Sequence, residues 1–303
     1  MPFERVAAIL AAAILPMGIL VACSPAEESG QALLESGQAL LASAAPEPTG
    51  PVLAVYDFSA PEVRFELPGR LDEISGLAFT AEGRLLGHDD ERGRVHEIDP
   101  RNGDVGRSFD LGSGNVQDDF EGIARIGERL FLVSSSGFLY EFRAGDEDAD
   151  VPYRVTDTGV GAVCEVEGLD YDPVAEGLVL ACKRSDGDGA TMTLYVLPVA
   201  GGPARPIRVA RSELVALGLD GDFQPSAVAV TGEGSWILLS AVTESIIEVG
   251  SSGRVLAGVA LGQRRHPQPE GLALADDGRL YIADEKNGDD AHITVYAPRG
   301  GGE

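Results

Sequence analysis

The chain is poor in basic residues. Its 303 residues include 23 Lys and Arg against 49 Asp and Glu, which gives a formal net charge of −26 at pH 7. Because so acidic a chain repels nucleic acid and anionic lipid headgroups, we expect no nucleic-acid partner. Most of this charge is expected to serve solubility, and a specific role for any carboxylate must follow from its position. Hydrophobic residues make up 44% of the chain, which is ample for a sizeable core.

Several signatures of catalysis and of helical folds are also missing. The sequence contains no nucleophile elbow, no phosphate-binding P-loop and no zinc-binding motif. From residue 52 onward, the apolar segments are short and separated by turns, with no helical periodicity between them. The main domain is therefore predicted to be all-β.

Cysteine is scarce, and the first of the three, Cys23, ends an apolar N-terminal segment. Residues 6–21 are short for a membrane span and sit where the core of a signal peptide lies. Leu20-Val21-Ala22-Cys23 resembles the lipobox of bacterial lipoproteins, in which the cysteine is lipidated and becomes the first residue. We therefore predict a signal peptide over residues 1–22 and a lipid anchor on Cys23. The alternative is an uncleaved anchor with an incidental cysteine.

A segment without a packed core follows the lipobox. The unit ESGQALL occurs twice in tandem, at 28–34 and 35–41, and three prolines follow between residues 46 and 51. We interpret residues 23–51 as a flexible tether that holds the domain off a membrane. Because Ser24 and not aspartate follows the lipidated cysteine, the usual sorting rule favours the outer membrane, facing the periplasm. The protein is thus expected in the cell envelope.

The other two cysteines flank one predicted hairpin. Cys164 precedes an apolar strand and Cys182 ends the next, and the compartment permits disulfides. A disulfide between them requires Cα atoms within about 7 Å, and the strand register decides this. The alternative is two buried thiols.

Residues 52–303 repeat one strand pattern five times. Each repeat has a first strand with Gly or Ala after a Ser or Glu, then a second apolar strand and a third strand. The residues before that Gly or Ala are Ser75, Glu121, Glu167, Ser226 and Glu270. Their spacings are 46, 46, 59 and 44, and an insertion at 211–222 explains the long one. Such regular strand repeats predict a β-propeller in a single domain, 52–303.

The fourth strands predict how the ring closes. Segments 106–111 and 254–261 each precede a repeat and fit outer strands, and 63–68 occupies the same place before the first repeat. We expect 63–68 to complete the last blade, which closes a ring of five blades. A six-bladed ring is the alternative, if 52–58 joins further strands.

Carboxylates recur on the first strands, which line the central channel of a propeller. Side chains two residues apart share a strand face, so each motif residue pairs with the residue two before it. The predicted metal ligands are Glu73, Asp119, Glu121, Glu165, Glu167 and Glu270. The second strands should bring further charged groups to the same rim, namely Asp89, Asp90, Lys183, Arg184 and Glu285. A set of oxygen ligands without histidine or thiolate suits Ca²⁺. The glycines are expected to let the strands approach closely.

The ordered set of repeats resembles a known family. EISGLAF with HDD, DFEGIA with GERLFLVS, EVEGLDYDP with GLVLACK, QPSAVAV, and PEGLALADDGRLYIADEKN together are similar to the SdiA-regulated (YjiK/CarP-like) bacterial β-propellers. The resemblance spans roughly residues 60–298. It implies a periplasmic or membrane-associated propeller and a link with calcium.

These observations favour a cell-envelope lipoprotein whose calcium-binding propeller is a non-catalytic binding or regulatory module. Its ligand at the channel mouth would be a protein or a small molecule. The alternative is a calcium-dependent hydrolase of phytase-like or lactonase-like type, with His88 or His266 moving protons beside the metal. Both histidines are more simply interpreted as surface or rim residues.

Overall fold

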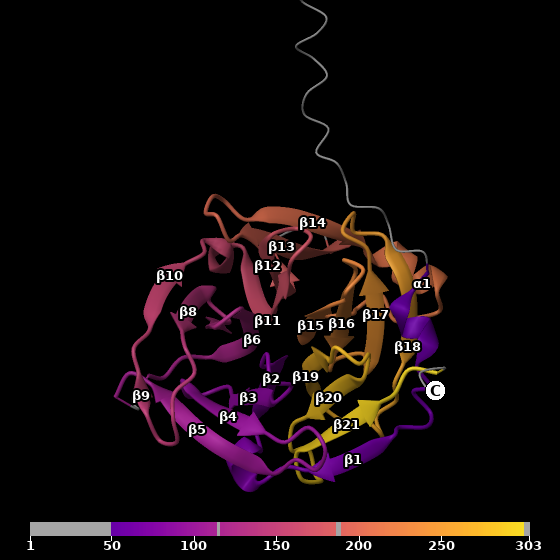
Figure 1. Ribbon diagram of the computed structural model, residues 1–303. Helices are drawn as coiled ribbons and strands as arrows, with labels where there is room; N and C mark the ends of the chain where they lie inside the picture. The colour runs from indigo at the N-terminus through magenta and orange to yellow at the C-terminus, as the bar shows by residue number, and fades with distance from the viewer. Residues whose placement is uncertain (1–49, 114–115, 186–188, 300–303) are drawn as a thin grey trace, which may run out of the picture. The chain divides into compact units, whose positions relative to one another are not determined.

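The computed structural model describes residues 50–113, 116–185 and 189–299. These residues form five sheets arranged radially around a central channel (Figure 1). The first strands of the five sheets contact one another in a closed ring, from β2 through β6, β11, β15 and β19 back to β2. The predicted five-bladed β-propeller is confirmed.

Each blade contains four antiparallel strands, numbered here from the channel outward. Blade 1 contains β2 (Ile74–Phe79), β3 (Leu85–Asp89), β4 (Arg94–Ile98) and β5 (Val105–Leu111). Blade 2 contains β6 (Phe120–Ile126), β7 (Arg129–Ser134), β8 (Phe138–Phe142) and β10 (Arg154–Asp157). Between these two blades, β9 (Asp150–Val151) adds a short parallel strand to the edge of β5.

The remaining blades follow the same order. Blade 3 contains β11 (Cys164–Asp172), β12 (Gly177–Ser185), β13 (Thr191–Pro198) and β14 (Arg205–Ala210). Blade 4 contains β15 (Ala227–Val230), β16 (Trp236–Ser240), β17 (Ser245–Val249) and β18 (Val255–Ala260). Blade 5 contains β19 (Pro269–Leu274), β20 (Leu280–Asp284), β21 (His292–Tyr296) and β1 (Val63–Glu66).

Blade 5 closes the ring with a strand from the N-terminal side. β1 pairs with β21 in antiparallel register, with Val63 opposite Val295 and Glu66 opposite His292. The predicted closure by segment 63–68 is therefore confirmed. Because the two strands are distant in the chain, their pairing holds the first part of the domain to the last.

The segment that a six-bladed ring would have needed is not a strand. Val52–Val55 forms a 3₁₀ helix (η1), and Leu53, Tyr56 and Phe58 pack into the core between blades 4 and 5. The backbone N–H of Leu53 donates to Oε2 of the buried Glu248 at 2.8 Å. The six-bladed alternative is wrong because this segment serves as a strap across two existing blades.

Short helices occupy three of the loops. Gly69–Leu71 (η2) precedes blade 1, Val160–Ala162 (η3) precedes blade 3, and Arg211–Ala216 (α1) precedes blade 4. α1 belongs to the insertion that lengthens one repeat spacing, and its Leu214 is buried against blades 3 and 4. No helix in the described ranges is long and apolar enough to cross a membrane. The predicted signal peptide 1–22, Cys23 and most of the tether 23–51 lie outside these ranges.

The core lies between blades. Five clusters of buried side chains are found, each formed by two neighbouring blades. The second strands are buried on both faces, as β16 and β20 show along their whole length. Their continuous apolar sequences follow from this position.

The glycines of the repeat motif allow the inner strands to approach. A Cβ on Gly122 would lie 2.6 Å from the backbone nitrogen of Leu169 in the next blade. A Cβ on Gly168 would lie 2.9 Å from the backbone nitrogen of Val228. Real Cβ atoms do not come so close to backbone atoms, so the ring could not close this tightly with larger residues. The predicted role of these glycines is confirmed.

Candidate ligand site at the acidic mouth of the channel

The motif residues lie near the start of each inner strand, at one end of the channel. Ser75 donates a hydrogen bond from Oγ to Oε2 of Glu121 in the next blade, at 3.2 Å. Ser226 donates from Oγ to the carbonyl oxygen of Pro269, also in the next blade, at 2.7 Å. The two motif serines therefore link neighbouring blades, while the three motif glutamates place carboxylates inside the channel.

A lysine from a second strand joins these glutamates. Nζ of Lys183 donates to Oε1 of Glu167 at 3.0 Å, and Glu167 is only 2% exposed. Burial lowers the pKa of Lys183, but the charges of Glu167, Glu270 and Glu121 outweigh burial and raise it. The ammonium group is therefore held in its charged form among glutamates from three blades.

The glutamates at the mouth have raised pKa values, so their ionised forms are disfavoured. Burial raises the pKa of Glu270 to about 8, and repulsion from Glu285 and Glu167 adds to this shift. Burial also raises the pKa of Glu285 to about 8, with further repulsion from Glu73 and Asp90. The pKa values of Glu121 and Glu167 are raised too, chiefly by burial. We call Glu121, Glu167, Glu270, Glu285 and Lys183 the central acidic cluster.

The other three predicted ligands lie on the rim around this cluster. Glu73 and Asp119 are exposed, and Glu165 is half-buried, with Oε2 3.5 Å from Nη1 of Arg184. Their charges reach inward, since Asp119 raises the pKa of Glu121 and Glu73 raises that of Glu285. The six predicted carboxylates thus occupy one end of the channel at two depths.

The sequence predicts Glu285 and Lys183 at the rim, whereas the structure places both in the central acidic cluster. Glu285 directly follows β20 and accepts a hydrogen bond from Nε2 of Gln268 at 2.5 Å. Lys183 lies on β12 between Cys182 and Arg184, which pair with Val166 and Glu165 on β11, and the register shifts at this step. The ends of the second strands predict both residues at the mouth, but strand order carries no information on how deep in the channel they lie.

The donor set suits calcium by chemistry but not by arrangement. Every acid in the cluster offers hard oxygen ligands, as Ca²⁺ prefers. Within the described residues, however, no group of three or more His, Cys, Asp or Glu side chains is placed to hold a metal ion. Lys183 already occupies one oxygen of Glu167. Binding of a calcium ion at the mouth would therefore require these acids to rearrange.

A disulfide braces the strands that carry Glu167 and Lys183. Cys164 on β11 and Cys182 on β12 are joined, with Cα atoms 5.6 Å apart. Both side chains are buried. The register of the hairpin therefore meets the geometric condition for a bridge, and the alternative of two free thiols does not occur.

The two histidines considered for proton transfer are not at the surface or rim, so that interpretation is wrong. His88 is fully buried, and its Nδ1 lies 2.9 Å from the carbonyl oxygen of Asp89. His266 is also fully buried, with Nδ1 2.7 Å from Oδ2 of Asp284 and Nε2 2.8 Å from the hydroxyl of Tyr296. Sequence position alone did not reveal these polar contacts.

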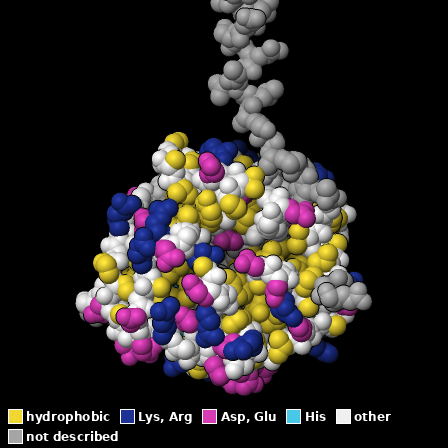
Figure 2. All heavy atoms as spheres, viewed as in Figure 1, with side chains coloured by type: hydrophobic (Ala, Val, Ile, Leu, Met, Phe, Trp, Pro, Cys, Tyr) yellow, Lys and Arg dark blue, Asp and Glu magenta, His cyan; other side chains and the backbone are white. Residues whose placement is uncertain are grey.

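Fold and site together define a five-bladed β-propeller with an acidic channel mouth. Figure 2 shows one face of the ring, on which acidic and basic side chains are scattered among hydrophobic ones. The chain matches the SdiA-regulated family over residues 58–288, and it belongs to that family. No curated protein matches the chain.

Solved structures share the fold at low sequence identity. A glutaminyl cyclase from Myxococcus xanthus is 17% identical, with a TM-score of 0.56 over 78% of this chain and 94% of that chain. A luciferin-regenerating enzyme is 12% identical, with a TM-score of 0.51 over 80% of this chain and 96% of that chain. Identities this low show the propeller fold alone, because one fold hosts many functions.

Proposed function

We propose that the protein is a cell-envelope lipoprotein whose propeller is a non-catalytic binding module, with the acidic mouth as the site for a cationic ligand. The observation that carries this proposal is the central acidic cluster. Four glutamates with raised pKa values share a single lysine there. Acids buried at this density are stabilised in their ionised form by any added positive charge.

Calcium is the cation that we propose first. Its binding would compete with two present features, the protons held by the cluster and the Lys183 ammonium on Glu167. Rim carboxylates such as Glu73 and Asp119 are exposed, and they would have to move toward the channel to join the ligand set. Calcium would therefore bind with release of protons and with rearrangement of the acids, and more weakly at low pH.

A binding role is favoured over hydrolysis by the positions of the histidines. The alternative needed His88 or His266 beside a metal at the mouth. Both side chains are buried, and His266 is fixed between Asp284 and Tyr296. Both rings are therefore enclosed by protein and are not open to a ligand at the mouth.

Calorimetric titration of the full-length chain in detergent tests the ligand. We expect saturable Ca²⁺ binding that weakens about tenfold or more in Glu167→Gln, a loss of about 1.4 kcal/mol. Glu128→Gln is the matched control, because Glu128 lies exposed in the turn before β7 at the far end of the blade. Equal effects of the two variants, or no binding by the wild type, would contradict the proposal. A diamine titrated in parallel separates a metal site from a site for organic cations.

Membrane fractionation tests the anchor. We expect the wild type in the outer-membrane fraction and Cys23→Ala in the soluble periplasmic fraction. Cys164→Ala is the control, since it removes a cysteine without removing the proposed lipid attachment. Retention of Cys23→Ala in the membrane would contradict lipidation and favour an uncleaved anchor.

A further inference from the structure

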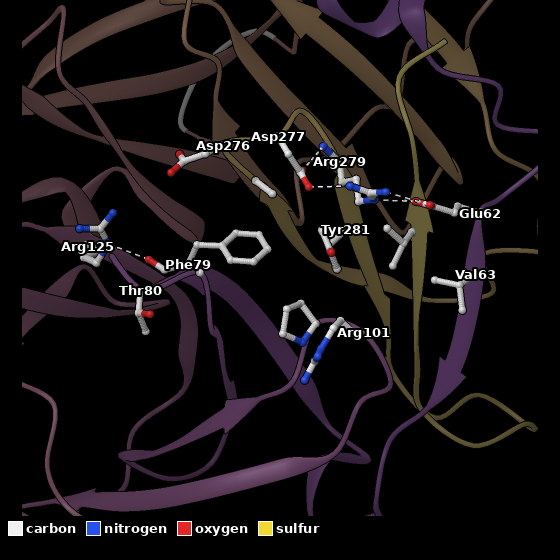
Figure 3. A pocket seen from close by; sticks show the side chains of 14 residues that line it. Glu62, Val63, Phe79, Thr80, Arg101, Arg125, Asp276, Asp277, Arg279 and Tyr281 are labelled. Carbon is white, nitrogen blue, oxygen red and sulfur yellow. Dashed lines mark hydrogen bonds and ion pairs between the residues drawn. The ribbon is translucent and has the colours of Figure 1, made fainter. Parts of the chain in front are cut away.

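A cavity of about 600 Å³ opens between blades 5 and 1, away from the acidic mouth (Figure 3). Phe79 ends β2, and Ala275 directly follows β19, so both lie at the far ends of strands that begin at the mouth. The cavity is therefore separate from the proposed cation site. Its volume is within the range of sites for small organic molecules.

The floor of the cavity is aromatic. The rings of Phe79 and Tyr281 lie 5.1 Å apart in an edge-to-face arrangement, from neighbouring blades. Val63 and Val295, which pair across β1 and β21, extend the apolar wall. A planar apolar group can pack on this surface with favourable ring contacts.

The Tyr281 hydroxyl supplies a polar group at this floor. Within the described residues it makes no hydrogen bond, and Figure 3 shows its oxygen at the cavity. Burial raises the pKa of Tyr281, so the phenol keeps its proton at neutral pH. A neutral phenol is a hydrogen-bond donor for a ligand oxygen.

Arg125 supplies positive charge on the side opposite Glu62. Its Nε donates to the carbonyl oxygen of Phe79 at 2.7 Å, and its Nη1 donates to that of Gly127 at 3.3 Å. In the described part of the chain, no carboxylate forms an ion pair with it. Burial raises the pKa of Asp170 and the charge of Arg125 partly offsets this rise, but the carboxylate oxygens of Asp170 accept hydrogen bonds from the backbone N–H groups of Tyr171 and Val230.

The other arginines at the cavity are already neutralised by contact. Arg279 donates from Nε and Nη2 to the two carboxylate oxygens of Glu62, at 2.7 and 3.0 Å, and from Nη1 to Asp277 at 2.6 Å. Arg101 is held by Asp99 at 2.6 Å. Arg125 is therefore the arginine that is available to an anion.

We propose that this cavity binds a small aromatic molecule carrying one carboxylate. The ring packs on Phe79 and Tyr281, and the carboxylate accepts hydrogen bonds from the guanidinium of Arg125, which suits carboxylate geometry. The Tyr281 hydroxyl donates to a ligand oxygen. This inference does not depend on the proposed cation site.

Such a ligand would also stabilise ring closure. The cavity walls include Val63 on β1 and Val295 on β21 of blade 5 and Phe79 on β2 of blade 1. A ligand that contacts both blades binds the closed ring and not the unfolded chain. Occupancy should therefore raise the melting temperature.

Three naphthalene probes of different charge test the proposal on the full-length chain. Titration calorimetry with 2-naphthoate, 2-naphthamide and 2-naphthylmethylammonium keeps the ring and changes only the polar group. We expect saturable 1:1 binding of 2-naphthoate, about tenfold tighter than that of the amide. The cation should bind weakest. No binding of 2-naphthoate, or preference for the cation, would overturn the proposal.

Two variants place the binding in this cavity. Arg125→Gln should remove the preference for the carboxylate over the amide, and Tyr281→Phe should weaken both probes. Arg205→Gln is the matched control, because Arg205 is exposed on β14 of blade 3. Unchanged 2-naphthoate binding in both cavity variants would overturn the assignment. Because Tyr281→Phe removes only a hydroxyl that makes no hydrogen bond to the described part of the chain, it tests the site even if Arg125→Gln does not fold.

Discussion

Nζ of Lys183 and Oε1 of Glu167 lie 3.0 Å apart at the centre of the acidic mouth, one from β12 and the other from β11. This ion pair is the single direct contact between a cation and the central glutamates in the described residues. The charge of Lys183 also partly offsets the raised pKa of three glutamates that it does not contact, namely Glu121, Glu270 and Glu285. The stability of the mouth therefore depends strongly on one lysine.

Lys183→Met should destabilise the protein at neutral pH. It leaves Glu167, which is 2% exposed, without its donor, and removing one partner of a buried polar pair costs about 1–3 kcal/mol. It also removes the positive charge that favours ionisation of Glu121 and Glu270. Urea unfolding at pH 7.5 measures the loss.

Lys286→Met is the control for this change. Lys286 is exposed and pairs with Asp72 at 2.8 Å, and exposed pairs contribute about 0–1 kcal/mol. Addition of Ca²⁺ should restore more stability to Lys183→Met than to the wild type, because the competing ammonium is gone. Equal unfolding midpoints for the two variants would contradict the central role of Lys183.

The raised pKa of Glu270 makes a defined contribution to pH dependence. The carboxyl titrates at about 8 when folded and near its ordinary value of 4.5 when unfolded. Between these values the folded protein keeps a proton that the unfolded chain has lost. This group's contribution to stability is therefore complete below pH 4.5 and falls as the pH rises toward 8.

Glu270→Gln isolates this contribution because glutamine does not titrate. From pH 5 to pH 8, the variant should gain stability relative to the wild type by on the order of 1–4 kcal/mol, since one pKa unit corresponds to about 1.4 kcal/mol. Wild-type curves alone are insufficient, because burial lowers the pKa of His88 and His96 to about 4 and destabilises the fold in acid. A flat difference between variant and wild type across this range would refute the prediction, and Glu128→Gln should give such a flat difference.

The sequence repeats made the fold predictable. Apolar alternation and turn spacing located all five inner strands, and the position of 63–68 before the first repeat located the closing strand. The strap at 52–58 was not predicted, since the periodicity of a short apolar segment does not distinguish a strand from a helix. Its 3₁₀ conformation depends on the distant Glu248, to which no local pattern points.

The candidate site could be predicted from the sequence only in part. Strand alternation assigned Glu121, Glu167 and Glu270 to the channel, but it carries no information on depth along the channel. Glu73 and Asp119 share a strand face with motif residues, and yet they lie exposed on the rim. The reach of Lys183 into the cluster depends on the shift in register between β11 and β12, which no sequence pattern encodes.

Gly122→Ala should destabilise the ring by about 1–3 kcal/mol, the usual cost of forcing atoms into a packed site. The new Cβ would lie 2.6 Å from the backbone nitrogen of Leu169, and backbone atoms cannot move aside as a flexible side chain can. Gly232→Ala is the control, because its Cβ would meet nothing within 4 Å. Urea unfolding of both variants measures the difference. Similar midpoints for the two would show that the inner strands are not in tight contact.

Reduction of the Cys164–Cys182 disulfide should lower stability by about 3 kcal/mol, because the bridge joins residues 18 apart and restricts the unfolded chain. The bridge also holds together the strands that carry Glu167 and Lys183, so Ca²⁺ binding should weaken in the same reduced protein. Chemical unfolding with and without reductant measures the first effect, and titration calorimetry measures the second. In the double variant Cys164→Ser, Cys182→Ser, reductant should change neither the unfolding midpoint nor the Ca²⁺ affinity. An unfolding midpoint that is independent of reductant in the wild type would show that the bridge does not contribute to stability in solution.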